Sequence, residues 1–368
     1  MFSKYILILV WVGLMAIVSA GFYRVEYNEL TEAEEWRVIP LFALIAFFPI
    51  IWMAGHRGWD GYFDTGLYIR SYWDMPARLS DLPAYLQTVS KDKGFYALSA
   101  FIKIVFGYNE DVYFTMIALL QGLCIVKLFR KYSSDYMMSV FLFVASTDYL
   151  SGMFNGIRQF MAAAIMYAAA PLMLKKKYIP MIICILFASF FHKSAVIMIP
   201  IVIIAQGKAW NKKTLLFIAG ILLSVAFVGR FTNILNSVLV ETQYVNVVSD
   251  YTAMNDDGTN PLRVLVYSIP CILSFLLRKK IDEESDPLIH FCTNMSIVTM
   301  GLYVLSMFTS GIFLGRLPMF CNLFCYILLP WEMENILGCQ YKKMMNAIMV
   351  GCYLLFYYYI IHFQYGLI

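Results

Sequence analysis

Residues 175–213 read KKKYIPMIICILFASFFHKSAVIMIPIVIIAQGKAWNKK, and this stretch decides the fold. Between its two lysine clusters lies an apolar run, 178–205, which is interrupted once at His192-Lys193-Ser194. Short loops rich in lysine and arginine stay on the cytoplasmic side of a membrane. Because both ends of the run carry such clusters, we expect two short helices that turn back at the triplet. This broken hairpin places His192 on the outer face.

The whole chain of 368 residues shares this character, with 61% hydrophobic and 14% charged residues. Average soluble domains are about 45–50% apolar and about 25% charged, so the surplus cannot be buried in one water-facing globule. The composition excludes soluble enzymes, nucleic-acid-binding domains, disordered proteins and secreted disulfide scaffolds. Most of the eight cysteines lie in or next to apolar runs, and Cys321 and Cys325 have no histidine beside them. We therefore expect small buried hydrophobic residues and no metal site.

We expect an all-α polytopic membrane protein with about 12 membrane-embedded helices, because a spanning segment must satisfy its own backbone hydrogen bonds. The apolar runs outside 178–205 lie at 5–23, 38–54, 111–129, 136–150, 157–174, 214–229, 262–277, 289–308, 314–330 and 344–362. Basic loops alternate with outer connections, which include a folded outer loop at 55–93 and a second outer loop at 230–261. No composition break divides the chain, so we expect 1–368 to form a single integral membrane domain.

The segment 94–107 is too short for an ordinary crossing and contains Lys103. We expect a re-entrant segment, which keeps the 55–93 loop outside; a full crossing would make that loop cytoplasmic. The re-entrant arrangement puts the N-terminus outside and the acidic 24–37 loop inside, against the charge rule. The side of the N-terminus therefore stays open.

Five ionisable residues fall on the face expected to be external: Arg57, Asp64, Arg158, His192 and Arg316. Each also has a structural interpretation, because arginines anchor helix ends at the interface, a histidine occupies a turn, and an aspartate caps a helix. Their convergence on one face favours a common site. Arginine forks bind diphosphate and stay charged in a poor dielectric. His192 or Asp64 would take the proton of an attacking hydroxyl, with His192 preferred because its ordinary pKa of about 6.5 lies near working pH.

A resemblance rests on short motifs that occur in a fixed order. They are Arg57, Asp64-Thr65-x-x-Tyr68, Lys93-Gly94-Phe95, Arg158-Gln159, Phe191-His192-Lys193-Ser194-Ala195 and Arg316-Leu317-Pro318-Met319-Phe320. This order resembles the EpsG-like family of exopolysaccharide polymerases, which are similar to the Wzy-type polymerases of O-antigen and capsule. One departure is that the family commonly has an acidic residue before Gly-Phe, where this chain has Lys93 with Asp92 adjacent.

The resemblance implies a bacterial inner-membrane glycosyltransferase with a GT-C-like fold. Such an enzyme joins oligosaccharide repeat units carried on undecaprenyl diphosphate, on the periplasmic or outer face, and the lipid diphosphate leaves. The implied partners are the lipid-linked donor and acceptor, the bilayer and a chain-length regulator protein, with no cofactor and no nucleic acid. By the same resemblance the catalytic residues are His192 and Asp64, and the substrate-binding residues are Arg57, Tyr68, Arg158, Gln159 and Arg316.

Two other classes stay open. An O-antigen ligase would use the same arginine and histidine chemistry with lipid A as acceptor. A flippase or transporter of lipid-linked oligosaccharide would also need a cationic interior, but it should have paired halves, and no internal repeat is visible in the sequence.

Overall fold

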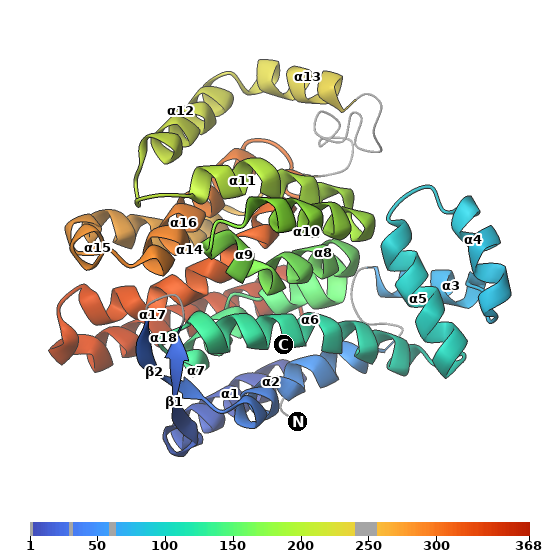
Figure 1. The fold of residues 1–368 in the computed structure, drawn as a ribbon, viewed down its shortest axis with the longest axis horizontal. Coiled ribbons are helices and arrows are strands. Elements are labelled where there is room, and N and C mark those ends of the chain that lie inside the picture. The colour runs from blue at the N-terminus through green and yellow to red at the C-terminus, as the bar shows by residue number, and fades with distance from the viewer. Residues whose placement is uncertain (1–2, 29–31, 59–63, 240–255) are drawn as a thin grey trace. The chain divides into compact units, whose positions relative to one another are not determined.

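The computed structural model describes residues 3–28, 32–58, 64–239 and 256–368. The chain packs as two compact units, one made of residues 1–197 and 343–368 and the other of residues 198–342. Helices make up most of the described structure and sheet almost none, which confirms the all-α prediction (Figure 1). The single membrane domain expected from the sequence stays a prediction.

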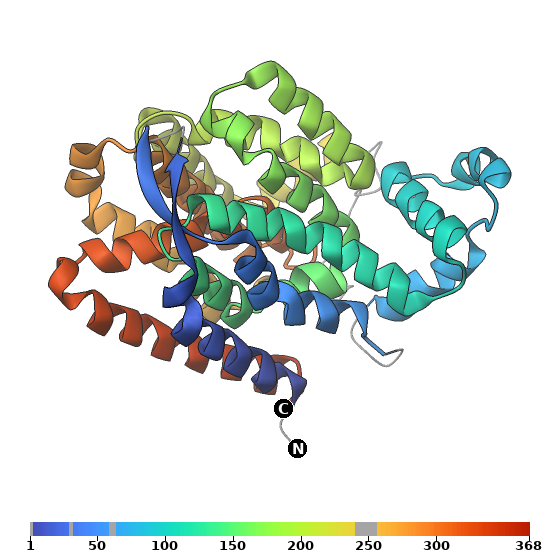
Figure 2. The same ribbon diagram turned by 60° about the horizontal axis from the view of Figure 1, so that its bottom comes forward.

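The first unit contains most of the sequence motifs. Its elements are α1 Lys4–Val18, η1 Ser19–Phe22, β1 Tyr23–Asn28, β2 Ala33–Val38, α2 Pro40–Gly55, α3 Thr65–Asp74, η2 Leu79–Asp81, α4 Leu82–Thr88, α5 Lys93–Phe106, α6 Glu110–Tyr132, α7 Tyr136–Ala145, η3 Leu150–Asn155, α8 Ile157–Ala168, α9 Ala170–Leu174, α10 Tyr178–Phe191, η4 Lys193–Ile197, α18 Lys342–Tyr359 and η8 Ile360–Gln364. Helices α1 and α18 lie side by side (Figure 2), and the Tyr357 hydroxyl donates to the carbonyl of Tyr5 at 2.8 Å. The two ends of this unit are thereby held together.

The second unit follows directly from η4. Its elements are α11 Met198–Ala205, α12 Lys212–Ala226, α13 Val228–Val238, α14 Pro261–Leu276, α15 Arg278–Glu284, α16 Pro287–Met307, η5 Leu314–Phe320, η6 Asn322–Phe324, α17 Cys325–Asn335 and η7 Cys339–Tyr341. Helix α16 is buried along most of its length and packs against α12 and α14.

Several helices are long and apolar enough to cross a membrane, as expected for a multi-pass protein. Among the described residues there are four such helices, or up to seven if each of three bent helix pairs counts as one span. The four are Lys4–Phe22, Glu110–Tyr132, Pro287–Met307 and Lys342–Gln364. The shorter apolar helices are Pro40–Gly55, Tyr136–Ala145, Tyr178–Phe191 and Lys193–Ala205. Many of the predicted spans are therefore short or bent.

A β-hairpin occupies the stretch expected to be an acidic loop at 24–37. Strands β1 and β2 pair antiparallel, with Val25 opposite Trp36. This register also sets Glu26 opposite Glu35, a repulsive pair. Arg130 at the end of α6 forms an ion pair with Glu26 and donates to the carbonyl of Val38 at 2.7 Å. The connection expected between two spans is thus an ordered hairpin, in which Arg24 and Arg37 also pair with Glu26 and Glu35.

The break predicted within 178–205 is present. Helix α10 ends at Phe191, His192 has extended backbone angles, and η4 begins at Lys193. Short η4 packs against both α10 and α8 in the first unit. The break therefore brings the polar triplet beside α8.

The 55–93 segment is helical where it is described, in α3, η2 and α4, while residues 59–63 lie outside the described part. Figure 1 shows α3, α4 and α5 gathered at one end of α6. Lys103 of α5 is only 1% exposed, and its Nζ donates to the carbonyls of Trp73 (2.7 Å) and Met75. Lys103, the cation of the predicted re-entrant segment 94–107, thus donates hydrogen bonds to the backbone carbonyls at the end of α3.

The predicted outer loop 230–261 begins as a helix. Helix α13 runs to Val238 and is bent by 105° from α12. Its apolar residues recur with helical spacing, which explains why this part does not form a loop. Residues 240–255, with Glu241 and Asp250, lie outside the described part of the chain.

The predicted span 314–330 starts with two short 3₁₀ turns instead of an α-helix. Arg316 lies within η5, and Pro318 follows it two residues later. Proline lacks an N–H group and disfavours the α conformation of the residue before it. Helix α17 therefore begins only at Cys325 and is bent by 51° from η5.

Candidate functional site

A buried aromatic cluster in the first unit forms the base of the candidate site. The cluster joins α3, α5, α6 and α8. Its largest members are Tyr68, Tyr72, Phe95, Tyr113 and Phe114. The rings of Tyr72 and Tyr113 stack with centroids 4.3 Å apart. Close-packed aromatic side chains hold polar neighbours in fixed positions.

Arg158, the second residue of α8, connects two other helices. Its Nη1 donates to Oδ2 of Asp92 at 2.7 Å, and its Nε donates to the Tyr68 hydroxyl at 3.4 Å. The Asp92 side chain is fully buried, whereas 20% of the Arg158 side chain is exposed. One guanidinium thus joins α3, the start of α5 and α8, and it still reaches the surface.

Asp92 precedes α5 in a left-handed backbone conformation, with φ 55°. Burial raises the pKa of its carboxyl, and the charge of Arg158 offsets this effect only in part. Gly94, two residues further, packs so closely against Phe190 that an added Cβ would lie 2.9 Å from that residue. Asp92 therefore lies where the start of α5 meets the end of α10.

A hydrogen-bonded chain connects α8 to His192. Gln159 Nε2 donates to Ser194 Oγ at 3.2 Å, and Ser194 Oγ lies 2.6 Å from His192 Nδ1. The backbone N–H of Ser194 also points at Nδ1, at 3.4 Å. Because a backbone N–H only donates, Nδ1 acts as acceptor, and in the neutral ring the proton lies on Nε2.

Arg57 follows α2 and is 3% exposed. Its Nη1 donates to the carbonyls of Met153 (3.0 Å) and Phe154 (2.8 Å), and its guanidinium lies 3.9 Å from the ring centroid of Phe114. Burial lowers the pKa of this guanidinium to about 9, so it stays protonated at neutral pH. Within the described part of the chain, Nε and Nη2 have no hydrogen-bond partner.

Asp64 stands at the N-cap position of α3 and is half-buried. Its carbonyl accepts the N–H of Tyr68 at 3.0 Å, but its side chain makes no capping hydrogen bond. Burial raises the pKa of the Tyr68 hydroxyl, and the charge of Arg158 opposes that rise while Asp64 adds to it. Asp64 is therefore close enough to act electrostatically on the hydroxyl that Arg158 contacts.

Arg316 belongs to the second unit, where it is half-buried in η5. The loop before it is held by Asp256, whose carboxylate accepts from Ser310 Oγ (2.7 Å) and from the backbone N–H groups of Gly311 (2.8 Å) and Ile312 (3.0 Å). Burial alone would raise the pKa of Asp256, but these hydrogen bonds keep it below its ordinary value. The loop that leads into Arg316 is therefore held in place by the Asp256 carboxylate.

The first unit therefore brings together most of the predicted residues. Tyr68, Arg158, Gln159 and His192 are connected through hydrogen bonds and packed helices, and Arg57 lies over the same aromatic cluster. Two contributors were not predicted: Asp92 and Ser194. Lys93 stands where the motif has an acidic residue, and the neighbouring Asp92 supplies the carboxylate. Ser194 was part of the hairpin motif but had no assigned role.

The chemical character of this site is cationic with hydrogen-bond donors. Arginine N–H groups and a protonated Nε2 suit phosphate oxygens, and a carboxylate suits a hydroxyl proton. Within the described ranges no group of three histidine, cysteine, aspartate or glutamate side chains is arranged to hold a metal ion.

The comparisons with known proteins agree with the family resemblance drawn from the motifs. A sequence model of the EpsG family matches residues 41–366. No curated protein and no solved structure matches the chain.

Proposed function

The chain belongs to the EpsG family, and from this premise we propose that it is a polysaccharide polymerase of the bacterial inner membrane. It joins oligosaccharide repeat units carried on undecaprenyl diphosphate at the periplasmic or outer face. Its partners are the lipid-linked donor and acceptor, the bilayer and a chain-length regulator protein.

The observation that most supports this proposal is the position of Arg158. It contacts Asp92 and Tyr68 from two other helices, and the next residue, Gln159, leads through Ser194 to His192. A planar cation held at a partly open position is suited to a diphosphate, which needs charge stabilisation as it leaves.

In the proposed reaction Arg158 binds the donor diphosphate, and Arg57 gives a supporting contact. For Arg316, in the other unit, a role in binding the diphosphate stays a prediction from the family resemblance. The bond between the anomeric carbon of the growing chain and the phosphate oxygen breaks, and its electron pair leaves with the lipid diphosphate. A new bond forms from that carbon to a hydroxyl oxygen of the incoming unit. Tyr68 and Gln159 position these groups.

The proton of the attacking hydroxyl goes to Asp64 or His192. The hydrogen bonds at Nδ1 favour Asp64 for this role, because the neutral ring of His192 carries its proton on Nε2. His192 then donates a hydrogen bond from its Nε2–H group to a diphosphate oxygen and keeps its proton. This assignment reverses the preference drawn from ordinary pKa values alone.

A deletion strain complemented with single variants tests the proposal. Asp64→Asn, Arg158→Lys and His192→Ala should each leave single repeat units on the final acceptor and abolish long chains on a polysaccharide gel. Arg70→Lys, at an exposed position of α3, is the matched control and should leave chain length unchanged. Wild-type chain length in all three variants would refute the assigned residues.

The same strain separates the rival classes. Loss of a polymerase leaves one-unit caps, loss of a ligase leaves polymer on the lipid carrier, and loss of a flippase leaves units inside the cell. Either of the last two results would overturn the proposed reaction.

A further inference from the structure

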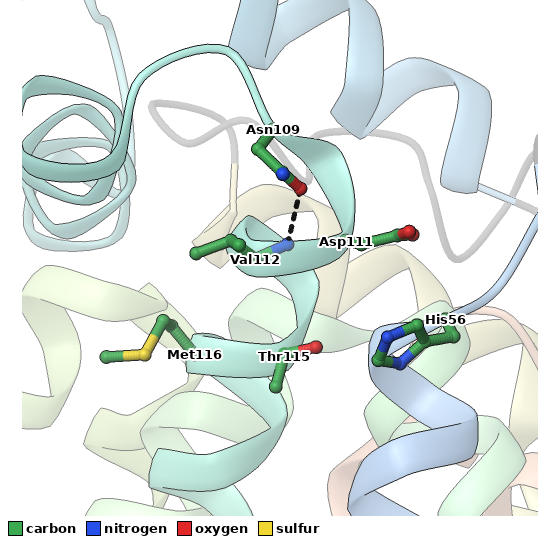
Figure 3. A pocket seen from close by; sticks show the side chains of 6 residues that line it. All are labelled: His56, Asn109, Asp111, Val112, Thr115 and Met116. Atoms are coloured by element: carbon green, nitrogen blue, oxygen red, sulfur yellow. Dashed lines mark hydrogen bonds between the residues drawn. The ribbon is translucent and has the colours of Figure 1, made fainter.

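An open pocket of about 360 Å³, lined by both polar and apolar side chains, lies between the end of α2 and the first turns of α6. Six residues line it, as Figure 3 shows: His56, Asn109, Asp111, Val112, Thr115 and Met116. The volume is within the range of about 300–1,000 Å³ that is usual for small-ligand sites. The family motifs include none of these residues.

The pocket exists because α2 and α6 come unusually close. A Cβ added at Gly55 would lie 2.1 Å from Oγ1 of Thr115, so only glycine allows this contact. His56 follows at once, with its ring stacked on Trp52 at 3.6 Å between centroids. Figure 3 shows Asp111 and Thr115 on the side of α6 that faces this imidazole.

The polar atoms of the pocket suit hydroxyl groups. His56 Nδ1 donates to the carbonyl of Trp52 at 3.1 Å, which leaves Nε2 of the neutral ring as an acceptor. Asn109 Oδ1 caps α6 by accepting the N–H of Val112 at 3.0 Å, so the Asn109 side-chain NH₂ group is its remaining donor. The Asp111 side chain is exposed, and the Thr115 hydroxyl adds a group that both donates and accepts.

Charge separates this pocket from the diphosphate site. The carboxylate of Asp111 repels phosphate, whereas sugar hydroxyls donate to it readily. Yet the two sites are neighbours, because Arg57 follows His56 in sequence and its guanidinium lies over Phe114, the residue before Thr115. A ligand could therefore place hydroxyls in the pocket with a reacting end near the cation.

We propose that this pocket binds an uncharged sugar of the acceptor repeat unit, an inference that rests on the proposed polymerase function. His56 Nε2 and Asp111 accept hydrogen bonds from sugar hydroxyls, and the Asn109 amide donates one. The Thr115 hydroxyl is the fourth hydrogen-bonding group, and it both donates and accepts. The lipid diphosphate binds separately, at the cationic cluster around Arg158.

The test uses purified full-length protein in detergent and one defined probe. The probe is the repeat-unit oligosaccharide released by mild acid from the lipid-linked pool of the deletion strain, so it carries no diphosphate. Its dissociation constant is measured by saturation-transfer NMR. Asp111→Asn should weaken binding about tenfold and Thr115→Val about fivefold, through the loss of one charged and one neutral hydrogen bond.

Two matched variants control this measurement. Asp81→Asn removes an exposed acid from η2 and should leave affinity unchanged. Arg70→Lys, at an exposed position of α3, should also leave it unchanged. Melting temperatures of the Asp111→Asn and Thr115→Val proteins should match wild type, which excludes a folding defect.

The pocket assignment is overturned if both pocket variants bind the probe as tightly as wild type, or if wild type does not bind it. Its failure is distinct from failure of the polymerase function. If Arg158→Lys stops chain growth while Asp111→Asn binds normally, the function stands and the pocket fails. If the deletion strain still makes long chains, the function itself fails.

Discussion

Replacing Asp256 by asparagine should destabilise the second unit and disturb the loop that precedes Arg316. The carboxylate accepts four hydrogen bonds, from the Ser310 hydroxyl and from the backbone N–H groups of Gly258, Gly311 and Ile312. An asparagine oxygen keeps two of these bonds, and the amide nitrogen then faces two donors. Asp256 is 6% exposed, so water does not replace the lost bonds.

The magnitude follows from these contacts. A hydrogen bond to a charged group contributes about 1.5–3 kcal/mol, so the loss of two costs at least about 3 kcal/mol of unfolding free energy. In a unit of this size that corresponds to a drop in melting temperature of roughly 10 °C. Ser310→Ala removes one of the four bonds and also the hydroxyl that accepts the N–H of Phe313 at 2.9 Å, so its cost should be similar, about 2–4 kcal/mol.

The assay is thermal unfolding of detergent-solubilised protein, followed by tryptophan fluorescence. Asp257→Asn is the control, because this neighbouring acid is exposed. The pH dependence gives a second readout. The hydrogen bonds hold the pKa of Asp256 below its ordinary value of 3.8, so the stabilisation is complete above that value and is lost as pH falls through the lower folded-state pKa.

Equal melting temperatures for the Asp256→Asn and Asp257→Asn proteins would refute this reasoning. So would an acid-induced loss of stability that persists unchanged in the Asp256→Asn protein. If the proposed role of Arg316 is correct, Asp256→Asn should also shorten the surface polymer, whereas Asp257→Asn should not.

Two further outcomes follow from buried polar contacts. Ser194→Ala removes the hydroxyl that contacts His192 Nδ1 and should reduce polymer chain length several-fold on gels. Its control is Ser189→Ala, which removes a hydroxyl bonded within α10 and should leave chain length unchanged. Lys103→Met leaves two backbone carbonyls at the end of α3 without their donor and should lower the unfolding free energy by about 2–3 kcal/mol. The measurement is a drop in melting temperature relative to wild type. Lys127→Met, at an exposed position, is the control.

The break at His192 could be predicted because its cause is local. Charged residues cannot continue an apolar helix through lipid, and lysine clusters fix the ends of the run. The hairpin at 24–37 could not be predicted in the same way, since Glu26 pairs not only with Arg24 beside it but also with Arg130 from the far end of α6. Local charge content does not reveal a partner that is about a hundred residues away.

The same contrast holds within the candidate site. Arg158 and His192 were identified by type and order, but the carboxylate paired with Arg158 comes from Asp92 and not from the next position, where the motif expects it. Asp92 has a left-handed backbone conformation before α5, and Gly94 packs closely against Phe190. Together these two features place the Asp92 carboxylate beside Arg158. Neither feature has a sequence signature of its own.

The sequence alone therefore determined the membrane character, the helical class, the family and the interrupted hairpin, because hydropathy and charge act on each segment independently. Only the tertiary structure decided which carboxylate meets Arg158, which nitrogen of His192 accepts a hydrogen bond, and that the end of α2 and the start of α6 line one pocket. These features depend on distances between segments far apart in the chain, which packing sets.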